Sequence, residues 1–600
     1  MKMNRRSFVK TTAQAGAALA AATRLVATTA TASREPLRQF DYSAVQLTGG
    51  PFAAQYDALR AHYLALSNDR LLKVYRQRAG LPAPGADMDG WYDLNGFVPG
   101  HSLGQYISGL ARIGASTGDS ACHGKIHALV EGFAQTLGPR NESILRPATN
   151  LWPCYILDKH FAGLIDAAKL SGMANGRELL SRVLEGALPL LPAQGRDRIG
   201  KKDPPYDETY VMPENLFLAS DLTGNPAFHE LAIRYLLDRE LFNPLADGKD
   251  PLPGKHAYSH AIAMSSAAQA YLHLGEPKYK QAMEHAFMLL TTQQQFASGG
   301  WGPNETFITP HRGELHAALS TTVDHFETPC GAYAATKLSR YLTTFDYSPR
   351  GTMHADNMER VLYNTVLAVK PPDDEGDYPY YSTYSPAARK VYYQAKWPCC
   401  SGTLIQTVAD YPLNLYFRAN DGLYVTQYTP SQVEFIHDGI RICITQQTEY
   451  PAEDVCTLSI ETDKPVTFTL ALRIPAWLER RAAIAVNGKP SAVEARPGTY
   501  SRLRRTWHTD DFVTLTLAQT FRTEAIDDRN PNTVALMRGG IQYVALSDSP
   551  TLGSERLTLP AGLRQAGPQS FVENYAGKTI TFVPLYLVRD QTYTSYFTRA

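Results

Sequence analysis

The chain lacks a surplus of charge of either sign, a long apolar run after its N-terminus and an even set of cysteines. Its 58 Lys and Arg residues equal its 58 Asp and Glu residues. This balance argues against nucleic acid as the main partner, because phosphate binding draws on an excess of basic side chains. No later stretch has about 18 consecutive uncharged apolar residues, so we expect no membrane span. The seven cysteines cannot all pair, so at least one thiol has another role.

The remaining composition is typical of a packed globular protein. Hydrophobic residues make up 44% of the 600-residue chain and charged residues 19%. A chain of this length exceeds a single domain and predicts roughly two to four. After the N-terminal segment we find neither a sequence repeat nor a low-complexity tract, which argues against a solenoid.

Residues 1–32 are predicted to be a twin-arginine export signal. Arg5-Arg6 precedes an alanine-rich run from Ala13 to Ala22, and Ala30-Thr31-Ala32 is a candidate cleavage site. The alternative is an amphipathic N-terminal helix. Export by this route implies a periplasmic or secreted bacterial protein that folds before crossing the membrane. A thiol or metal site would then form before it meets the oxidising compartment.

From residue 33 to about 420 the chain reads as helices. Leu103, Tyr106, Ile107 and Leu110, for example, share the face of a helix. Twelve such segments form six pairs, which predict an (α/α)6 barrel. The segments are 53–67, 101–117, 123–138, 155–172, 177–192, 208–222, 225–242, 257–274, 277–296, 331–345, 352–368 and 403–417.

After about residue 420 the pattern changes to alternating strands separated by turns. Val466–Leu470 and Val513–Leu517 alternate in this way, and Asn487-Gly488 is a hairpin turn signal. We therefore predict an α+β multidomain protein. Its barrel at 33–420 is followed by a β-sandwich at 421–535, and a C-terminal β region at 536–600 completes that sandwich or forms a second one.

Three of the cysteines lie where a helix is expected to begin. Thr328 is the expected N-cap of a helix and Pro329 its first residue, which would place Cys330 in the first turn. Cys399 and Cys400 precede the last barrel helix. The positive end of a helix dipole favours a thiolate at such positions. The other four, Cys122, Cys154, Cys443 and Cys456, are interpreted as buried structural thiols.

Together with Glu327, these three thiols would supply three sulfur donors and one oxygen donor. That set suits a tetrahedral Zn²⁺ ion. The donors come from two distant segments, so spacing alone leaves both a metal site and a group of buried thiols open.

Several motifs follow one another along nearly the whole mature chain. They are Gly100-His101-Ser102-Leu103-Gly104-Gln105-Tyr106, His256-Ala257-Tyr258-Ser259-His260, Glu305-Thr306-Phe307, Glu327-Thr328-Pro329-Cys330, Glu359-Arg360-Val361-Leu362-Tyr363-Asn364, Tyr380-Tyr381, Trp397-Pro398-Cys399-Cys400-Ser401-Gly402-Thr403, Leu472-Arg473-Ile474-Pro475-Ala476-Trp477 and Val486-Asn487-Gly488-Lys489. In these motifs the chain resembles the bacterial β-L-arabinofuranosidase clan of glycoside hydrolase families 127 and 146.

The resemblance implies a barrel with β-sandwich domains, a zinc thiolate site and a retaining exo-acting hydrolase. Cys399 would be the nucleophile and Glu305 the general acid/base. The implied zinc ligands are Glu327, Cys330, Cys399 and Cys400. The implied contacts along the sugar are His101, His256, His260, Glu359 and Tyr381.

The chain also departs from the family pattern. The commoner spacing is Glu-x-Cys, whereas here Pro329 adds one residue between Glu327 and Cys330, which opens the role of Glu327 as a ligand. Asp158 replaces a histidine and could change the sugar subsite. Glu314 is the rival of Glu305 as acid/base, since reach to the glycosidic oxygen decides that role.

Each assigned residue also has a structural alternative. His256 and His260 could be surface neighbours or a metal pair. Glu359 could form an ion pair with Arg360. Tyr381, like the tyrosine before it, could pack in the core.

The sequence therefore leaves three functions open. The leading hypothesis is a zinc-dependent β-L-arabinofuranosidase-like hydrolase acting on an oligosaccharide or glycoconjugate. The alternatives are a noncatalytic zinc-stabilised carbohydrate-binding protein and a polysaccharide lyase on the same barrel. The sequence leaves the sugar, the linkage and the oligomeric state open, with a homodimer as one option.

Overall fold

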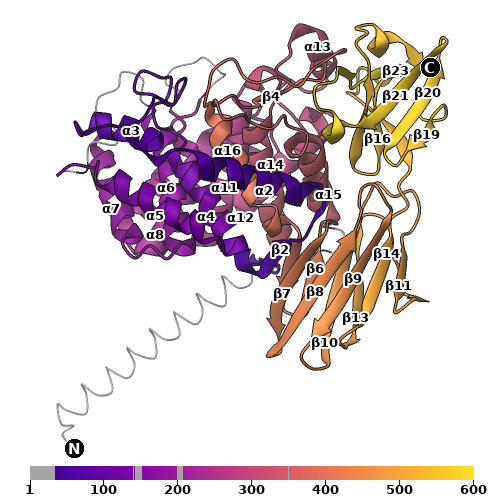
Figure 1. Cartoon of the computed structure of the whole chain (residues 1–600), viewed down its shortest axis with the longest axis horizontal. Coiled ribbons are helices and arrows are strands. Elements are labelled where there is room, and N and C mark those ends of the chain that lie inside the picture. The colour runs from indigo at the N-terminus through magenta and orange to yellow at the C-terminus, as the bar shows by residue number, and fades with distance from the viewer. Residues whose placement is uncertain are drawn as a thin grey trace, which may run out of the picture.

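The computed structural model describes residues 34–139, 141, 152–198, 207–346, 348 and 351–599. The predicted export signal lies outside them. A helical part is followed by two regions of β-structure (Figure 1). In the described part of the chain, no helix has the length and apolar character needed to cross a membrane.

Six helices of the described residues form a closed inner ring. Each packs against the next in chain order, and the last packs against the first. They are α4 (Leu103–Thr117), α6 (Pro153–Leu170), α8 (Pro213–Thr223), α11 (Ala257–Leu274), α14 (Thr328–Phe345) and α16 (Cys399–Ala409). Their side chains are buried over most of their surface, as expected of helices covered on both sides.

A second layer of helices covers this ring from outside. α2 packs on α16, and each of the others packs on the inner helix that precedes it along the chain. They are α2 (Gly50–Ala65), α5 (Ser120–Ala134), α7 (Gly176–Ala187), α9 (Pro226–Tyr235), α12 (Pro277–Leu289) and α15 (Thr352–Val361). The predicted (α/α)6 barrel is confirmed.

Smaller helices complete the helical part. They are α3 (Asn68–Arg78), α10 (Asn243–Ala246) and α13 (Glu314–Thr321), together with the π-helical turns η5 (Asp238–Phe242), η6 (Leu290–Gln294) and η8 (Leu362–Val366). The sequence prediction missed α3 and α13. It also ran the last helix to residue 417, whereas α16 ends at Ala409 and strand β5 begins at Tyr416.

Two glycines allow α4 and α6 to cross closely. A Cβ atom on Gly104 would lie 2.0 Å from the carbonyl oxygen of Lys159, and one on Gly163 would lie 2.3 Å from that of Gly104. Only glycine fits such backbone contact. The motif around Gly104 therefore has a packing role in the ring.

The barrel brings the N-terminal ends of its inner helices to one end. An outer helix lies between successive inner helices, so the inner helices run in the same direction. His256 is the N-cap of α11, Glu327 the N-cap of α14 and Cys399 the first residue of α16. Helix N-termini carry partial positive charge and stabilise anionic side chains. This end of the barrel is therefore suited to hold thiolates and carboxylates.

The first β region consists of two facing sheets. The five-stranded sheet has the order β1-β5-β6-β10-β13, and the seven-stranded sheet has the order β12-β11-β14-β9-β8-β7-β2. Phe435 of β7 and Phe468 of β10 pack between them, with ring centroids 6.0 Å apart. The strands are β1 (Arg38–Gln39), β2 (Val45–Leu47), β5 (Tyr416–Ala419), β6 (Gly422–Val425), β7 (Ser431–His437), β8 (Ile440–Thr448), β9 (Val455–Thr462), β10 (Val466–Ile474), β11 (Ala483–Val486), β12 (Lys489–Pro490), β13 (Thr499–Trp507) and β14 (Phe512–Thr516).

The second β region is a nine-stranded sheet. It begins with β15 (Phe521–Ala525), which pairs with β16, so its first strand precedes residue 536. Two N-terminal strands, β1 and β2, likewise join the sandwich rather than the barrel. The remaining strands are β16 (Thr533–Arg538), β17 (Ile541–Leu546), β18 (Arg556–Leu557), β19 (Arg564–Gly567), β20 (Ser570–Tyr575), β21 (Lys578–Pro584), β22 (Tyr593–Thr594) and β23 (Phe597–Arg599).

Candidate active site

The three predicted site cysteines meet at the N-terminal ends of α14 and α16. The Sγ atom of Cys330 lies 3.5 Å from that of Cys399 and 3.4 Å from that of Cys400. All three side chains are buried. The expected cap of α14 was wrong by one residue: Glu327 is the N-cap, and the Thr328 hydroxyl instead bonds the Phe326 carbonyl.

Glu327 joins this group despite the additional Pro329. Its Oε1 atom lies 3.3 Å from the Sγ of Cys399 and 3.9 Å from that of Cys400. One donor atom from each of Glu327 and the three cysteines lies within 4.8 Å of all the others. The extra residue between Glu327 and Cys330 is therefore absorbed at the start of α14.

The donor set fits a metal ion. Sulfur ligands around a tetrahedral Zn²⁺ lie about 3.8 Å apart, since Zn–S bonds are about 2.3 Å long. The observed Sγ separations of 3.4 and 3.5 Å need little adjustment to reach this. The Oε2 atom of Glu327 is buried and has no hydrogen-bond partner in the described chain. A buried carboxylate oxygen in that state is suited to a cation. The group can hold a metal ion.

The three thiols differ in acidity. Burial raises the pKa of Cys399, but hydrogen bonds from Cys330 and Cys400 and the nearby Lys159 ammonium outweigh it and hold the pKa well below its usual value. Burial raises the pKa of Cys330 and of Cys400 well above it. Cys399 is therefore the thiol that carries negative charge most readily. The thiolate is the nucleophilic form of cysteine.

Lys159 is a buried cation without a hydrogen-bond partner in the described structure. Its Nζ atom lies 3.2 Å from the ring centroid of Tyr155, a cation–π contact. Burial lowers its pKa, while the charge of Cys399 opposes that shift. The preceding residue, Asp158, faces the other way and accepts a hydrogen bond from Asn215 at 2.8 Å.

Glu305 lies in a short helical turn with unusual backbone geometry. Its φ is +60° and that of Asn304 is +54°, both in the left-handed region that non-glycine residues rarely adopt. The Tyr381 hydroxyl donates a hydrogen bond to its Oε1, and the His256 Nε2 lies 3.5 Å from its Oε2. Two of the predicted sugar contacts therefore converge on the predicted acid/base.

A two-stranded ladder connects the cysteine group to Glu305. Strand β3 (Phe326–Glu327) pairs with β4 (Tyr381–Ser382), and Glu327 lies directly opposite Tyr381. The preceding Tyr380 lies with its hydroxyl 3.6 Å from the Sγ of Cys399. Donor atoms of Glu327, Glu305 and His256 also lie within 4.8 Å of one another. Glu327 thus touches both halves of the site.

Behind His256 lies a buried ion pair that sequence reasoning missed. Glu208 accepts a hydrogen bond from Arg198 and lies with its Oε1 3.2 Å from the His256 Nδ1. Burial raises the pKa of Glu208, but Arg198 and His256 outweigh it and bring the pKa to about 2. Burial lowers the pKa of His256, yet its bonds to Glu208 and Glu305 raise it overall. No motif in the sequence distinguishes Arg198 or Glu208 from ordinary surface charges.

These groups surround a cavity of about 420 Å³. Cys399, Glu305, Glu327 and His256 line it together with Arg198 and Glu208. Its other walls are aromatic and come from Trp91, Phe97, Trp152, Tyr155, Tyr258, Tyr380 and Tyr393. A pocket with aromatic walls and a few polar groups at one end is suited to a sugar, which presents C–H faces and hydroxyls.

Two predicted histidines lie behind the cavity wall. His101 packs beside Tyr155, and burial together with Lys159 lowers its pKa to about 3, so it is neutral. Its Nε2 atom has no partner in the described structure. His260 is fully buried, with its Nε2 2.7 Å from Asp197. Both His256 and His260 are buried, so they are not a surface pair.

Glu359 lies outside the cavity. It sits at the interface of α15 with the β-sandwich and is fully buried. Arg473, Tyr450 and Trp477 occupy both of its oxygens, the last two at 2.6 and 2.8 Å. Its neighbour Arg360 instead pairs with Glu524. The structure thus places Glu359 in an ion pair between domains, with Arg473 rather than Arg360.

Glu314 lies in a different cavity from Glu305. Its Oε2 accepts a hydrogen bond from the Thr309 backbone at 3.1 Å. The cavity of Glu314 shares no lining residue with the cavity of Cys399. Between the two glutamates, the geometry favours Glu305 as the acid/base.

The fold is shared with solved structures of glycoside hydrolases. A β-L-arabinofuranosidase from Geobacillus stearothermophilus T6 superposes with a TM-score of 0.73 at 17% identity, covering 93% of this chain and 100% of that one. A second GH127 β-arabinofuranosidase gives 0.71 at 17% identity, covering 95% and 98%. A search of curated proteins finds no match. In architecture the protein belongs to the class of helical-barrel enzymes followed by β-sheet domains.

The family follows from the sequence itself. A model of the GH127 β-L-arabinofuranosidase catalytic domain matches residues 44–413, and one of the middle domain of the same family matches residues 422–519. The chain belongs to the GH127 β-L-arabinofuranosidase family and is a glycoside hydrolase with a carbohydrate substrate. The family prediction is confirmed, and a lyase and a noncatalytic binding protein are set aside.

Proposed function

We propose that this protein is a retaining, exo-acting β-L-arabinofuranosidase with Cys399 as nucleophile and Glu305 as general acid/base. The observation that carries the proposal is a thiol with a strongly lowered pKa and a buried glutamate lining the same cavity. Cys399 is only 4% exposed, which suits attack on the terminal sugar of an oligosaccharide or glycoconjugate.

The reaction is a double displacement in two balanced steps. The Sγ of Cys399 bonds to the anomeric carbon as the glycosidic C–O bond breaks, and Glu305 gives its proton to the leaving oxygen. Water then attacks the same carbon, Glu305 takes its proton, and the C–S bond breaks to restore the thiolate. Two inversions at one carbon retain its configuration.

The residues around Glu305 support both of its roles. Tyr381 and His256 each hold one of its oxygens and so fix the direction of the carboxyl. Glu208 and Arg198 hold His256 from behind. His256 lines the cavity and would bond the sugar hydroxyls, and the aromatic rings of the walls would cover the C–H faces of the sugar. Tyr381 would act through its hydrogen bond to Glu305.

Glu327, Cys330, Cys399 and Cys400 are the proposed ligands of a Zn²⁺ ion. When bound, zinc keeps thiols deprotonated at neutral pH and so supplies the nucleophile in its reactive form. The sulfur-rich donor set favours zinc over magnesium or calcium, which prefer oxygen ligands.

The test is hydrolysis of an aryl β-L-arabinofuranoside followed by proton NMR of the newly released sugar. We expect the β-anomer to appear first, and activity to fall when the protein is dialysed against a chelator and to return with Zn²⁺. Metal analysis should give about one zinc per chain. Initial release of the α-anomer would overturn the retaining mechanism, and preference for another aryl glycoside would overturn the sugar assignment.

We also propose export to the periplasm or medium through residues 1–32. The twin-arginine pattern Arg5-Arg6 supports this proposal. Replacing both arginines by lysine should retain the protein in the cytoplasm, as checked by cell fractionation. Unchanged export of that variant would contradict it.

A further inference from the structure

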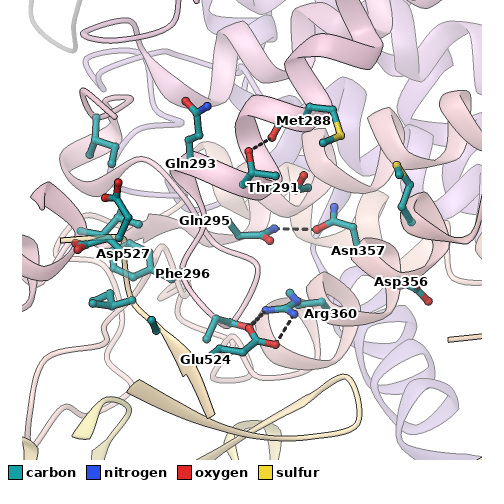
Figure 2. Close-up of a pocket in the computed structure, with 18 of the residues that line it drawn as sticks. Met288, Thr291, Gln293, Gln295, Phe296, Asp356, Asn357, Arg360, Glu524 and Asp527 are labelled. Carbon is teal, nitrogen blue, oxygen red and sulfur yellow. Dashed lines mark hydrogen bonds and ion pairs between the residues drawn. The ribbon is translucent and has the colours of Figure 1, made fainter. Parts of the chain in front are cut away.

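A second cavity lies where the barrel meets both β regions. It has a volume of about 770 Å³, compared with about 420 Å³ for the cavity of Cys399, and the two share no lining residue. Small-molecule sites occupy about 300–1,000 Å³. Figure 2 shows its walls, with Met288 and Gln293 from the end of α12 and η6, Asn357 from α15 and Glu524 from β15.

Five carboxylates, two arginines and one histidine line this cavity. Glu524 pairs with Arg360 and Arg522, and Asp528 lies 2.7 Å from the His311 Nδ1. Asp356 pairs with Arg473 at 2.5 Å. The remaining two lining carboxylates, Glu314 and Asp527, accept hydrogen bonds from backbone N–H groups. An anionic ligand would be repelled by these carboxylates, whereas their oxygens can accept hydrogen bonds from the hydroxyls of an uncharged ligand. The cavity is therefore suited to a hydroxyl-rich ligand without negative charge.

The uncharged groups of the lining combine exposed apolar atoms with amides and hydroxyls. Met288 is 44% exposed and Met353 is 47% exposed, so both present apolar surface to the cavity. The Gln295 and Asn357 amides bond each other at 2.8 Å, as Figure 2 shows. The Gln293 amide makes no hydrogen bond within the described chain. Apolar patches beside free amides match the C–H faces and hydroxyls of a sugar.

The backbone around the cavity has a second feature of binding sites. The π-helical turn η6 contributes Thr291, Thr292 and Gln293 to the wall. Such turns are rare and often occur at functional sites. The chain that follows lines the cavity at residues 295–297, contributes Glu305 to the catalytic cavity, and returns to line the second cavity at 308, 311 and 313–315. One continuous segment therefore borders both cavities.

From these observations we infer that the second cavity binds a neutral oligosaccharide, separately from the cavity that contains Cys399. Its carboxylate and amide groups beside exposed methionines assign the class of ligand. This inference uses the carbohydrate class of the GH127 substrate but does not depend on the sugar proposed above.

The test is calorimetric titration of the full-length protein with α-1,5-L-arabinotetraose, cellotetraose and β-1,4-galactotetraose, three neutral tetrasaccharides. The variants are Gln293→Trp, which fills the cavity, and Met353→Arg, which changes an exposed position at its edge and leaves the core intact. The control is Ile233→Arg, an apolar residue with the same 44% exposure as Met288 but outside both cavities. Thermal unfolding of each variant verifies the fold.

We expect at least one tetrasaccharide to bind with a Kd near the millimolar range, as is usual for small neutral ligands. Both cavity variants should weaken this binding at least about tenfold, which corresponds to about 1.4 kcal/mol. Ile233→Arg should bind as the wild type does, and hydrolysis of a small aryl glycoside should be unchanged in all three.

Two results would overturn the inference. One is the absence of binding by all three tetrasaccharides, and the other is binding that both cavity variants leave unchanged. Failure of the proposed activity is seen separately, as absent hydrolysis of the aryl β-L-arabinofuranoside. The two proposals can therefore fail independently.

Discussion

Two regions of the molecule bury glutamates, and they treat them in opposite ways. At the interface with the β-sandwich, Glu359 has both oxygens occupied by Arg473, Tyr450 and Trp477. At the end of the barrel where the inner helices begin, Glu327 keeps one buried oxygen without a hydrogen-bond partner among the described residues, and its other oxygen lies near the thiols of Cys399 and Cys400. Both residues belong to motifs that resemble the family.

The difference shows how to separate a structural carboxylate from a functional one. When a buried charge is fully paired, its partners offset the free energy lost on desolvation, and none of its hydrogen-bonding positions is open to a ligand. A buried polar atom without a partner is costly and needs a reason, such as a metal or a substrate. Glu359 is of the first kind and Glu327 of the second. The partners of each carboxylate, rather than its burial, separate the two.

The largest expected effect concerns the site formed by Glu327 and the three cysteines. Cys399→Ala should lower kcat by about four orders of magnitude or more, because it removes the nucleophile. The matched control is Cys456→Ala, since Cys456 is also a buried thiol but lies in β9 of the sandwich. That control should keep its kcat. Steady-state kinetics of both variants provides the measurement, and equal losses in the two would remove Cys399 from the reaction.

A smaller loss is expected on replacing the acid/base. Glu305→Gln should lower kcat about 10²- to 10⁴-fold, the usual contribution of general acid catalysis. The loss should shrink for substrates whose leaving group needs no protonation. Glu314→Gln should remain close to the wild type, because Glu314 lies in the other cavity. The reverse ranking of these two variants would assign the role to Glu314.

The sequence predicted more of the fold than of the site. Periodic apolar residues such as Leu103 and Tyr106 determine which face of a helix is buried, and the barrel follows from the number of such helices. The cysteines at the starts of α14 and α16 were also predictable, since capping residues and prolines precede helices. The resemblance then brought the two segments together, and the structure places Glu327 with them.

Other parts of the site depend on tertiary contacts that no local pattern contains. Arg198 and Glu208 become part of it only because the barrel brings them behind His256. The left-handed backbone of Glu305 occurs at a residue other than glycine, so the sequence does not indicate it. His260 and Glu359 were expected along the sugar, and those assignments stay predictions. Their observed contacts are with Asp197 and Arg473.

Replacing Glu359, at the interface with the β-sandwich, should lower stability rather than activity. Glu359→Gln places an amide against Arg473, Tyr450 and Trp477, which all donate hydrogen bonds to the carboxylate. Breaking one partner of a buried ion pair costs about 3–5 kcal/mol. Chemical denaturation should show this decrease in the free energy of unfolding, while kcat of the folded variant stays close to that of the wild type. A selective loss of kcat without a loss of stability would instead return Glu359 to the sugar site.

The smallest effect concerns pH and a second paired carboxylate, Glu524. Burial raises its pKa, but Arg360 and Arg522 outweigh it and lower the pKa from 4.5 to about 2. Because the folded-state pKa lies below the unfolded one, the pair stabilises the protein fully above pH 4.5 and loses this contribution as the pH falls toward 2. The contribution is at most about 3 kcal/mol, since one pKa unit corresponds to about 1.4 kcal/mol.

Glu524→Gln isolates this contribution, because acid titration of the other carboxylates is common to both proteins. The difference in unfolding free energy between wild type and Glu524→Gln should be constant near neutral pH and should shrink between pH 4.5 and about 2. Urea denaturation at a series of pH values measures it. If the difference in unfolding free energy stayed constant down to about pH 2, the ion pair with Arg360 would not determine the charge of Glu524. The distinction between paired structural carboxylates and functional ones would then not apply to Glu524, which lies where the barrel meets the β regions.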